Sequence, residues 1–208
     1  MDDCCANKAK ELEQLARHAE QGRVLVTVLA LNAAMFVIEF TAGLIAGSAA
    51  LMADSVDMLG DASVYALSLY ALGRSERWKA GAAMAKGGFI LLLGLGVVWE
   101  IGVKLRTGMP PSSTLMLAFA GLALAVNLLC LRLIWRFRSL DLNMSSAVEC
   151  SRNDVIANSG VLVAAAAVAL TGSFWPDVIV AAVIAGLFLR SAVRMIAQSW
   201  PFLRPARG

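Results

Sequence analysis

Charged residues are scarce in this sequence. Asp, Glu, Lys and Arg make up 16% of its 208 residues, whereas a typical soluble domain carries about 25%. Hydrophobic residues account for 59% of the chain, and the mean hydropathy is +0.72. This composition excludes an ordinary soluble domain, a disordered chain, a collagen and a coiled coil. It is typical of a membrane protein that crosses the bilayer several times.

Other features are missing too, and each absence removes a class of function. The net charge is only +3, with no run of five basic residues, so no nucleic-acid partner is expected. The four cysteines lie at positions 4, 5, 130 and 150, two of them in apolar stretches, which argues against a disulfide scaffold. The sequence contains no P-loop and no catalytic constellation, so we do not expect an enzyme or nucleotide hydrolysis by this chain.

Six apolar segments dominate the rest of the chain, and each is long enough for the ~20 residues that a membrane helix needs. Only helices or closed barrels satisfy the backbone in lipid, and the alternation of a barrel is absent. We therefore expect an all-α integral membrane protein with a six-helix domain over residues 23–199 and a short tail over 200–208. The expected spans are residues 23–47, 49–73, 79–105, 113–137, 143–171 and 175–199.

The first 22 residues are polar and lack the apolar stretch of a signal peptide. We expect them to be retained as a cytoplasmic tail that forms a short surface helix.

Basic residues indicate the orientation of the spans, because Lys and Arg favour the cytoplasmic side. On one side of the predicted membrane, the middle loop is the only loop that carries basic residues, namely Lys104 and Arg106. The pattern predicts that both termini are cytoplasmic and that the protein is a multi-pass protein of the plasma (inner) membrane. The basic residues on the other side are Lys8, Lys10, Arg17, Arg23, Arg74, Arg77, Lys79, Arg132, Arg136, Arg138, Arg194, Arg204 and Arg207.

Acidic residues interrupt two of the apolar segments, where each ionisable group costs at least ~2.5–3.5 kcal/mol and is usually functional. Asp54, Asp57 and Asp61 follow one face of the second span. Cys150 and Asp154 lie one helical turn apart in the fifth. If the two faces meet, Asp57, Asp61, Cys150 and Asp154 supply four ligands, a number that suits tetrahedral zinc.

Structural explanations of the same residues remain open. Asp54 is as easily explained by an ion pair or a helix cap, and a buried cysteine such as Cys150 is often a small hydrophobe. Two carboxylates one turn apart repel each other, so a cation must offset Asp57 and Asp61. Lys86 and Arg152 are the candidate structural partners.

Several motifs, in order, resemble those of the cation diffusion facilitator (CDF) family. Residues 48–61 read SAALMADSVDMLGD and resemble the second-helix signature of the family. Asn32 and Glu39 match its usual first-helix pattern. The remaining motifs are DLNMSSA at residues 141–147, which leads into Cys150 and Asp154, and TGSFWPD at residues 171–177 followed by LRSA at residues 189–192.

The resemblance implies a function and a site. Members exchange divalent metals for protons through paired ligands on the second and fifth helices. Carried over, these are Asp57 with Asp61, and Cys150 with Asp154. Asp54 matches a frequent acidic position one turn above the site, where it is a candidate proton relay. The transported metal, zinc or cadmium, is the expected cargo, and no permanently bound cofactor is expected.

The sequence departs from the family pattern in three ways. Cys150 replaces the usual His or Asp, and its softer thiolate favours cadmium, mercury or zinc over manganese. We expect no cytoplasmic domain of the kind that typically follows the sixth helix and helps members to dimerise, although we still expect a homodimer. The loop between the fourth and fifth helices has no His run, since the only histidine is His18.

The residues thus predict secondary efflux of divalent cations in exchange for protons. Four anionic ligands are too costly in an empty apolar cavity, so protons and metal should compete for them. Two alternatives remain open. One is a metal-binding membrane protein that uses Cys4, Cys5 and Cys150 to pass soft metals such as mercury inward or to a partner. The other is a structural membrane protein with buried ion pairs and no transport.

Overall fold

The computed structural model describes the backbone of residues 2–70, 76–138 and 142–203. It describes side chains within residues 20–60, 62, 78, 80–138, 148 and 151–201. Helices joined by short turns make up this part of the chain, which contains no strand. The helices are α1 (Asp2–Ala46), α2 (Ala49–Tyr70), α3 (Glu76–Thr107), α4 (Ser113–Trp135), α5 (Leu142–Thr171) and α6 (Trp175–Leu203).

The expected helix ends agree with the observed ones wherever a glycine marks a turn. Gly47, Gly108 and Gly172 have φ angles of 60°, 66° and 63° and follow the ends of α1, α3 and α5. A residue with a Cβ is strained at these angles, which explains why glycine ends the helices there. At the start of the chain the outcome differs from the expectation. The polar tail forms no separate surface helix, because α1 continues unbroken from Asp2 to Ala46.

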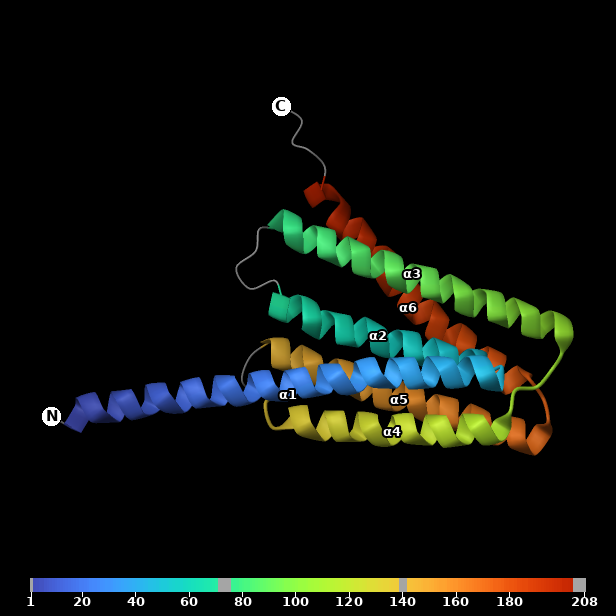
Figure 1. Cartoon of the computed structure of the whole chain (residues 1–208), viewed down its shortest axis with the longest axis horizontal. Coiled ribbons are helices and arrows are strands. Elements are labelled where there is room, and N and C mark those ends of the chain that lie inside the picture. The colour runs from blue at the N-terminus through green and yellow to red at the C-terminus, as the bar shows by residue number, and fades with distance from the viewer. Residues whose placement is uncertain (1, 71–75, 139–141, 204–208) are drawn as a thin grey trace, which may run out of the picture.

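The helices form a group of four and a pair (Figure 1). Helices α1, α2, α4 and α5 pack together, and α3 packs along α6 beside them. Helices α2 and α5 belong to the group of four, and both contact α6. They therefore form the side of this group that faces the pair. The start of α1 and the end of α6 lie toward the same end of the bundle (Figure 1), as an even number of alternating helices requires.

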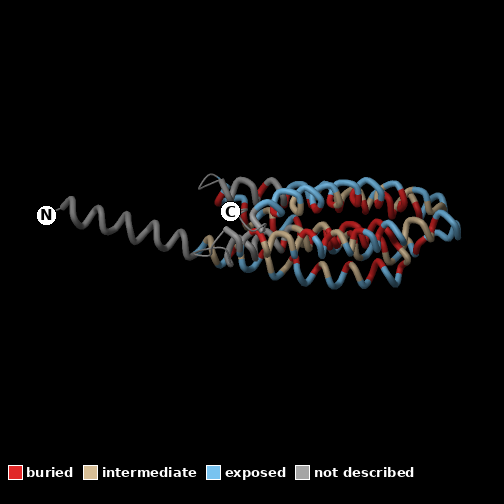
Figure 2. Tube along the Cα trace, turned by 90° about the horizontal axis from the view of Figure 1, so that it is seen from above, coloured by how far each residue is buried: buried red, intermediate tan, exposed pale blue. Residues whose placement is uncertain are grey.

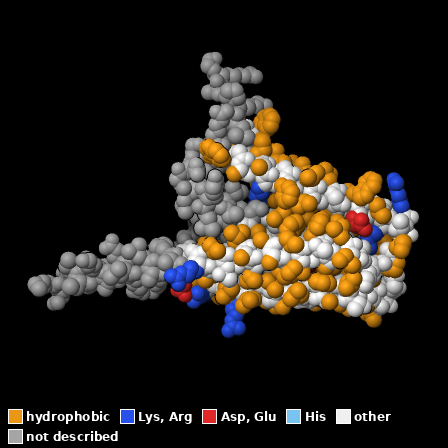
Figure 3. Space-filling model, viewed as in Figure 1, with side chains coloured by type: hydrophobic (Ala, Val, Ile, Leu, Met, Phe, Trp, Pro, Cys, Tyr) orange, Lys and Arg blue, Asp and Glu red, His pale blue; other side chains and the backbone are white. Residues whose placement is uncertain are grey.

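Buried residues lie on the sides of the helices that face one another, and exposed residues lie on the outer sides (Figure 2). The core at the start of α2 is built from small residues: Ala49, Ala50 and Ala53 are fully buried. The outer flank is largely hydrophobic (Figure 3), with exposed residues such as Leu92, Trp99 and Leu187. A soluble protein rarely exposes so much apolar surface, whereas a membrane protein presents it to lipid.

Within the described residues, five helices contain a span that is long and apolar enough to cross a membrane. These helices are α1, α3, α4, α5 and α6. Helix α2 is not among them, and it carries Asp54, Asp57 and Asp61 within its 22 residues. The chain is therefore an all-α, multi-pass membrane protein, and one of its helices is unusually acidic.

Glycines allow two of the helix pairs to approach closely. A Cβ on Gly43 of α1 would lie 2.8 Å from Cγ of Met52 on α2. A Cβ on Gly94 of α3 would collide with Leu189 and Phe188 of α6. A Cβ on Gly88 or Gly96 would meet no atom within 4 Å. Gly43 and Gly94 thus serve packing within the molecule, one of the two roles that small residues have in membrane helices.

Candidate metal centre

Asp57 lies on the wall of a cleft. The cleft has a volume of about 630 Å³ and runs between α5 and α6, with Asp57 reaching it from α2. Asn153 and Ser191 are its other polar lining residues, and the remaining lining residues are Ala, Gly, Val, Ile, Leu and Phe. A half-buried carboxylate in an apolar membrane cleft is placed to meet an ion.

Asp154 follows Asn153 on α5 and is buried, with 5% of its surface exposed. Helices α2 and α5 are in contact, so the structure brings together the two helices that carry the predicted ligands. The Asn158 side chain donates a hydrogen bond to the Asp154 carbonyl (2.9 Å). Cys130 of α4 lies within electrostatic reach of Asp154, but it is buried among apolar residues such as Val28 and Ile134, as a packing residue would be.

The other two predicted ligands, Asp61 and Cys150, have side chains outside the described residues, and so do Cys4 and Cys5. Among the side chains that are described, no three His, Cys, Asp or Glu residues gather closely enough to hold a metal ion. The described part of the site is therefore one carboxylate on each of α2 and α5, and the four-ligand sphere stays a prediction.

Asp54, the candidate proton relay, has an acidic neighbour that the site prediction did not include. Glu39 of α1 and Asp54 of α2 interact, although they are only 0% and 1% exposed. Asp57 also acts electrostatically on Asp54. The signal for Glu39 was present in the sequence, because it is an acidic residue inside an apolar segment.

The group of four helices contains further buried polar side chains. Both amide atoms of Asn127 on α4 are buried without a hydrogen-bond partner, as are Oδ1 of Asn32 and Oδ1 of Asn158. Unpartnered polar groups are costly in a dry apolar core. Asn32, Asn127 and Asn158 thus place polar atoms on α1, α4 and α5 inside a group whose other buried residues are largely apolar.

Asp177 forms a second buried polar cluster at the end of the molecule where α2 and α6 begin. Its carboxylate accepts hydrogen bonds from the Ser48 hydroxyl (2.6 Å) and from the backbone N–H groups of Ala49 (3.0 Å) and Ala50 (3.1 Å). Lys104 of α3 lies 3.2 Å from the same carboxylate, and the two side chains are 4% and 0% exposed. Asp177 thus caps α2 from a distant part of the chain. The cluster ties α2, α3 and α6 together, and its role is positional.

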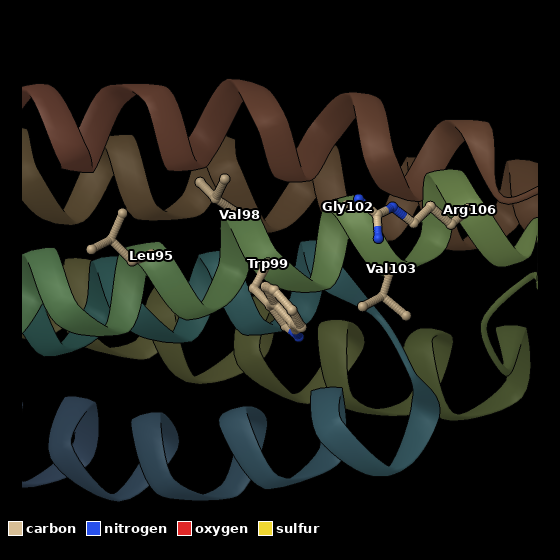
Figure 4. A pocket seen from close by; sticks show the side chains of 6 residues that line it. All are labelled: Leu95, Val98, Trp99, Gly102, Val103 and Arg106. Carbon is tan, nitrogen blue, oxygen red and sulfur yellow. The ribbon is translucent and has the colours of Figure 1, made fainter.

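A separate, shallow hollow lies along α3 (Figure 4). Its volume is about 280 Å³, and its lining residues are Leu95, Val98, Trp99, Gly102, Val103 and Arg106. None of these residues is a carboxylate, thiol or imidazole, so the hollow lacks metal ligands.

Comparison with known proteins identifies the family. The model of the cation efflux transmembrane domain matches residues 25–203. The zinc transporter ZitB of Escherichia coli is 27% identical over 190 residues, which cover 85% of this chain and 61% of ZitB. The metal cation efflux system protein CzcD of Cupriavidus metallidurans is 26% identical over 198 residues, which cover 86% of this chain and 63% of CzcD.

A third relative, the cadmium, cobalt and zinc/H(+)-K(+) antiporter of Bacillus subtilis, is 25% identical over 194 residues. This chain therefore spans about three fifths of the length of these relatives. The matched part runs from within α1 to the end of α6 and includes α2 and α5 with their acidic residues. The resemblance that the motifs predicted is confirmed, and the chain belongs to the cation efflux family, a family of transporters rather than enzymes.

Proposed function

We propose that this chain exports divalent heavy-metal cations, zinc or cadmium, from the cytoplasm in exchange for protons. The metal is carried at a mid-membrane site shared by α2 and α5, with Asp57, Asp61, Cys150 and Asp154 as ligands. The observation that carries the proposal is Asp57 on the wall of a membrane cleft, with Asp154 buried on the helix beside it. The names of the relatives support the cargo: ZitB is a zinc transporter, and the Bacillus subtilis relative is named for cadmium, cobalt, zinc and protons.

Proton exchange follows from the chemistry of the ligands. Carboxylates and a thiolate bind a metal only when deprotonated, so metal binding releases protons and protonation releases the metal. If the site faces one side of the membrane at a time, an inward proton gradient drives the metal outward. The cleft beside Asp57 provides room for a cation to reach the site.

Transport by purified protein in proteoliposomes tests the proposal. We expect cadmium or zinc flux when a pH gradient is imposed, and we expect the flux to vanish in Asp57→Ala and in Asp154→Ala. Glu100→Gln is the matched control, because Glu100 is a carboxylate in α3 and does not line the cleft. Flux that persists in both alanine variants refutes the assigned site, and flux without proton movement refutes the exchange.

A further inference from the structure

Two carboxyl groups face each other in the interior, and no salt bridge among the described residues involves either of them. Glu39 on α1 and Asp54 on α2 are 0% and 1% exposed. Both carboxyl oxygens of Glu39, and Oδ2 of Asp54, are buried without a hydrogen-bond partner of good geometry. Glu39 therefore points an unsatisfied, fully buried acid at Asp54.

The groups that act most strongly on the pair are acids. After burial itself, the strongest electrostatic influence on Glu39 comes from Asp54, and on Asp54 it comes from Asp57. Helix α1 packs against α2 and α4, and the only charged residue of α4 is Arg132, in its last turn. The helices packed against α2 also carry charged groups, namely Lys86, Glu100, Lys104 and Arg106 on α3, Arg152 and Asp154 on α5, and Asp177, Arg190 and Arg194 on α6.

Among the described residues, neither Glu39 nor Asp54 forms a salt bridge. Lys104, a buried cation near the start of α2, is already paired with Asp177. Two adjacent carboxylates with both charges intact are too costly in such a place. A proton held between them removes one charge and supplies the missing hydrogen-bond donor.

The pair is coupled electrostatically to the cleft. Asp54 is influenced by Glu39 and also by Asp57, and Asp57 lines the cleft. A dication beside Asp57 lowers the cost of a second negative charge on the neighbouring pair.

We propose that Glu39 and Asp54 form a proton-binding site, separate from the metal ligands, which is loaded when the metal site is empty and unloaded when a divalent cation binds. The proton leaves the carboxyl oxygen of the pair and enters water in the cleft, so that both carboxylates remain as anions. This inference rests on the proposed function, and it adds Glu39 to the groups that exchange protons.

Infrared difference spectroscopy of the full chain, with Cd²⁺ alone added as the probe, tests it. In the wild type we expect Cd²⁺ to remove a band of protonated carboxyl groups. In Glu39→Gln part of this loss should disappear, and proton release, counted by calorimetry in buffers of different ionisation enthalpy, should fall by about one proton per Cd²⁺ bound. Glu100→Gln should match the wild type in both measurements.

The outcomes separate this inference from the proposed function. If Glu39→Gln binds Cd²⁺ with an unchanged spectrum and proton count, the inference is wrong and the function stands. If Asp57→Ala still transports Cd²⁺, the proposed function fails whatever Glu39 does. Should Glu39→Gln not fold, Asp54→Asn is read in the same way. A metal-free wild type without any protonated carboxyl band at neutral pH overturns the inference without the use of a variant.

Discussion

At the scale of single residues, acidic side chains inside apolar helices carried most of the information. Asp57 was predicted as a site residue, and it lines the cleft. Lys104 was interpreted as a loop charge, and this was wrong: it is buried against Asp177. Local sequence cannot reveal such a partner, because Asp177 lies far away in the chain. Glu39 shows the same limit, since only the packing of α1 on α2 reveals that it faces Asp54.

Cys150 should set the preference for the metal. Replacing the thiolate with a hydroxyl removes a soft ligand, so Cys150→Ser should weaken cadmium binding more than cobalt binding. We expect cadmium affinity to fall by at least about 10-fold, the lower bound for losing an outer-sphere partner of a metal site. Titration of the purified variant with each metal measures this, with Cys130→Ser as the control for a buried thiol that is not a predicted ligand. Equal losses for both metals would show that Cys150 is not a ligand.

At the scale of helices, the sequence alone predicted some helix ends correctly and missed others. Glycine turns predicted the ends of α1, α3 and α5, because a positive φ is a local property. The continuity of α1 was missed, because the change from polar to apolar residues was taken as a boundary although no breaker interrupts the helix. The cap on α2 was missed because its acceptor, Asp177, comes from α6.

Variants of the Asp177 cluster should lose stability in a definite order. Asp177→Asn leaves Lys104 as a buried, unpaired cation, and breaking a buried pair in this manner costs about 3–5 kcal/mol. Lys104→Met should cost less, because Asp177 keeps its three hydrogen bonds from residues 48–50. The double variant should be more stable than Asp177→Asn. Thermal unfolding in detergent measures the order, and a Lys104→Met variant less stable than Asp177→Asn would contradict it.

The contact between α3 and α6 should depend on Gly94. Gly94→Val introduces a branched side chain where a Cβ already collides with Leu189 and Phe188, and overpacking of this kind typically costs about 1–3 kcal/mol. Gly96→Val on the same helix has open space around its Cβ and serves as the matched control. The melting temperature in detergent should fall for the first variant only. Equal shifts would mean that the close approach at Gly94 is not a stabilising contact.

At the scale of the whole molecule, hydropathy sufficed to predict an all-α membrane protein, because six apolar segments leave few other solutions. The start of α1 and the end of α6 lie at the same end of the bundle (Figure 1). The charge pattern of the loops predicts that this end is cytoplasmic. The burial of Lys104 strengthens the pattern, because it leaves Arg106 as the one exposed basic residue of the opposite middle loop.

Thiol labelling of intact cells tests this orientation. In a chain whose four native cysteines are replaced with serine, Thr171→Cys at the end of α5 and Arg138→Cys after α4 both lie at exposed positions. A membrane-impermeant reagent should label the first and not the second, and both should react after the cells are opened. Labelling of Arg138→Cys alone in intact cells would invert the proposed direction of transport.

The central claim is that one divalent cation sits between α2 and α5. Anomalous scattering from crystals soaked in zinc tests it most directly. The account predicts a peak at about 2.0–2.3 Å from side-chain atoms of Asp57, Asp61, Cys150 and Asp154, which is lost in Asp154→Asn. A peak elsewhere, or none between the two helices at full zinc occupancy of the protein, would contradict it.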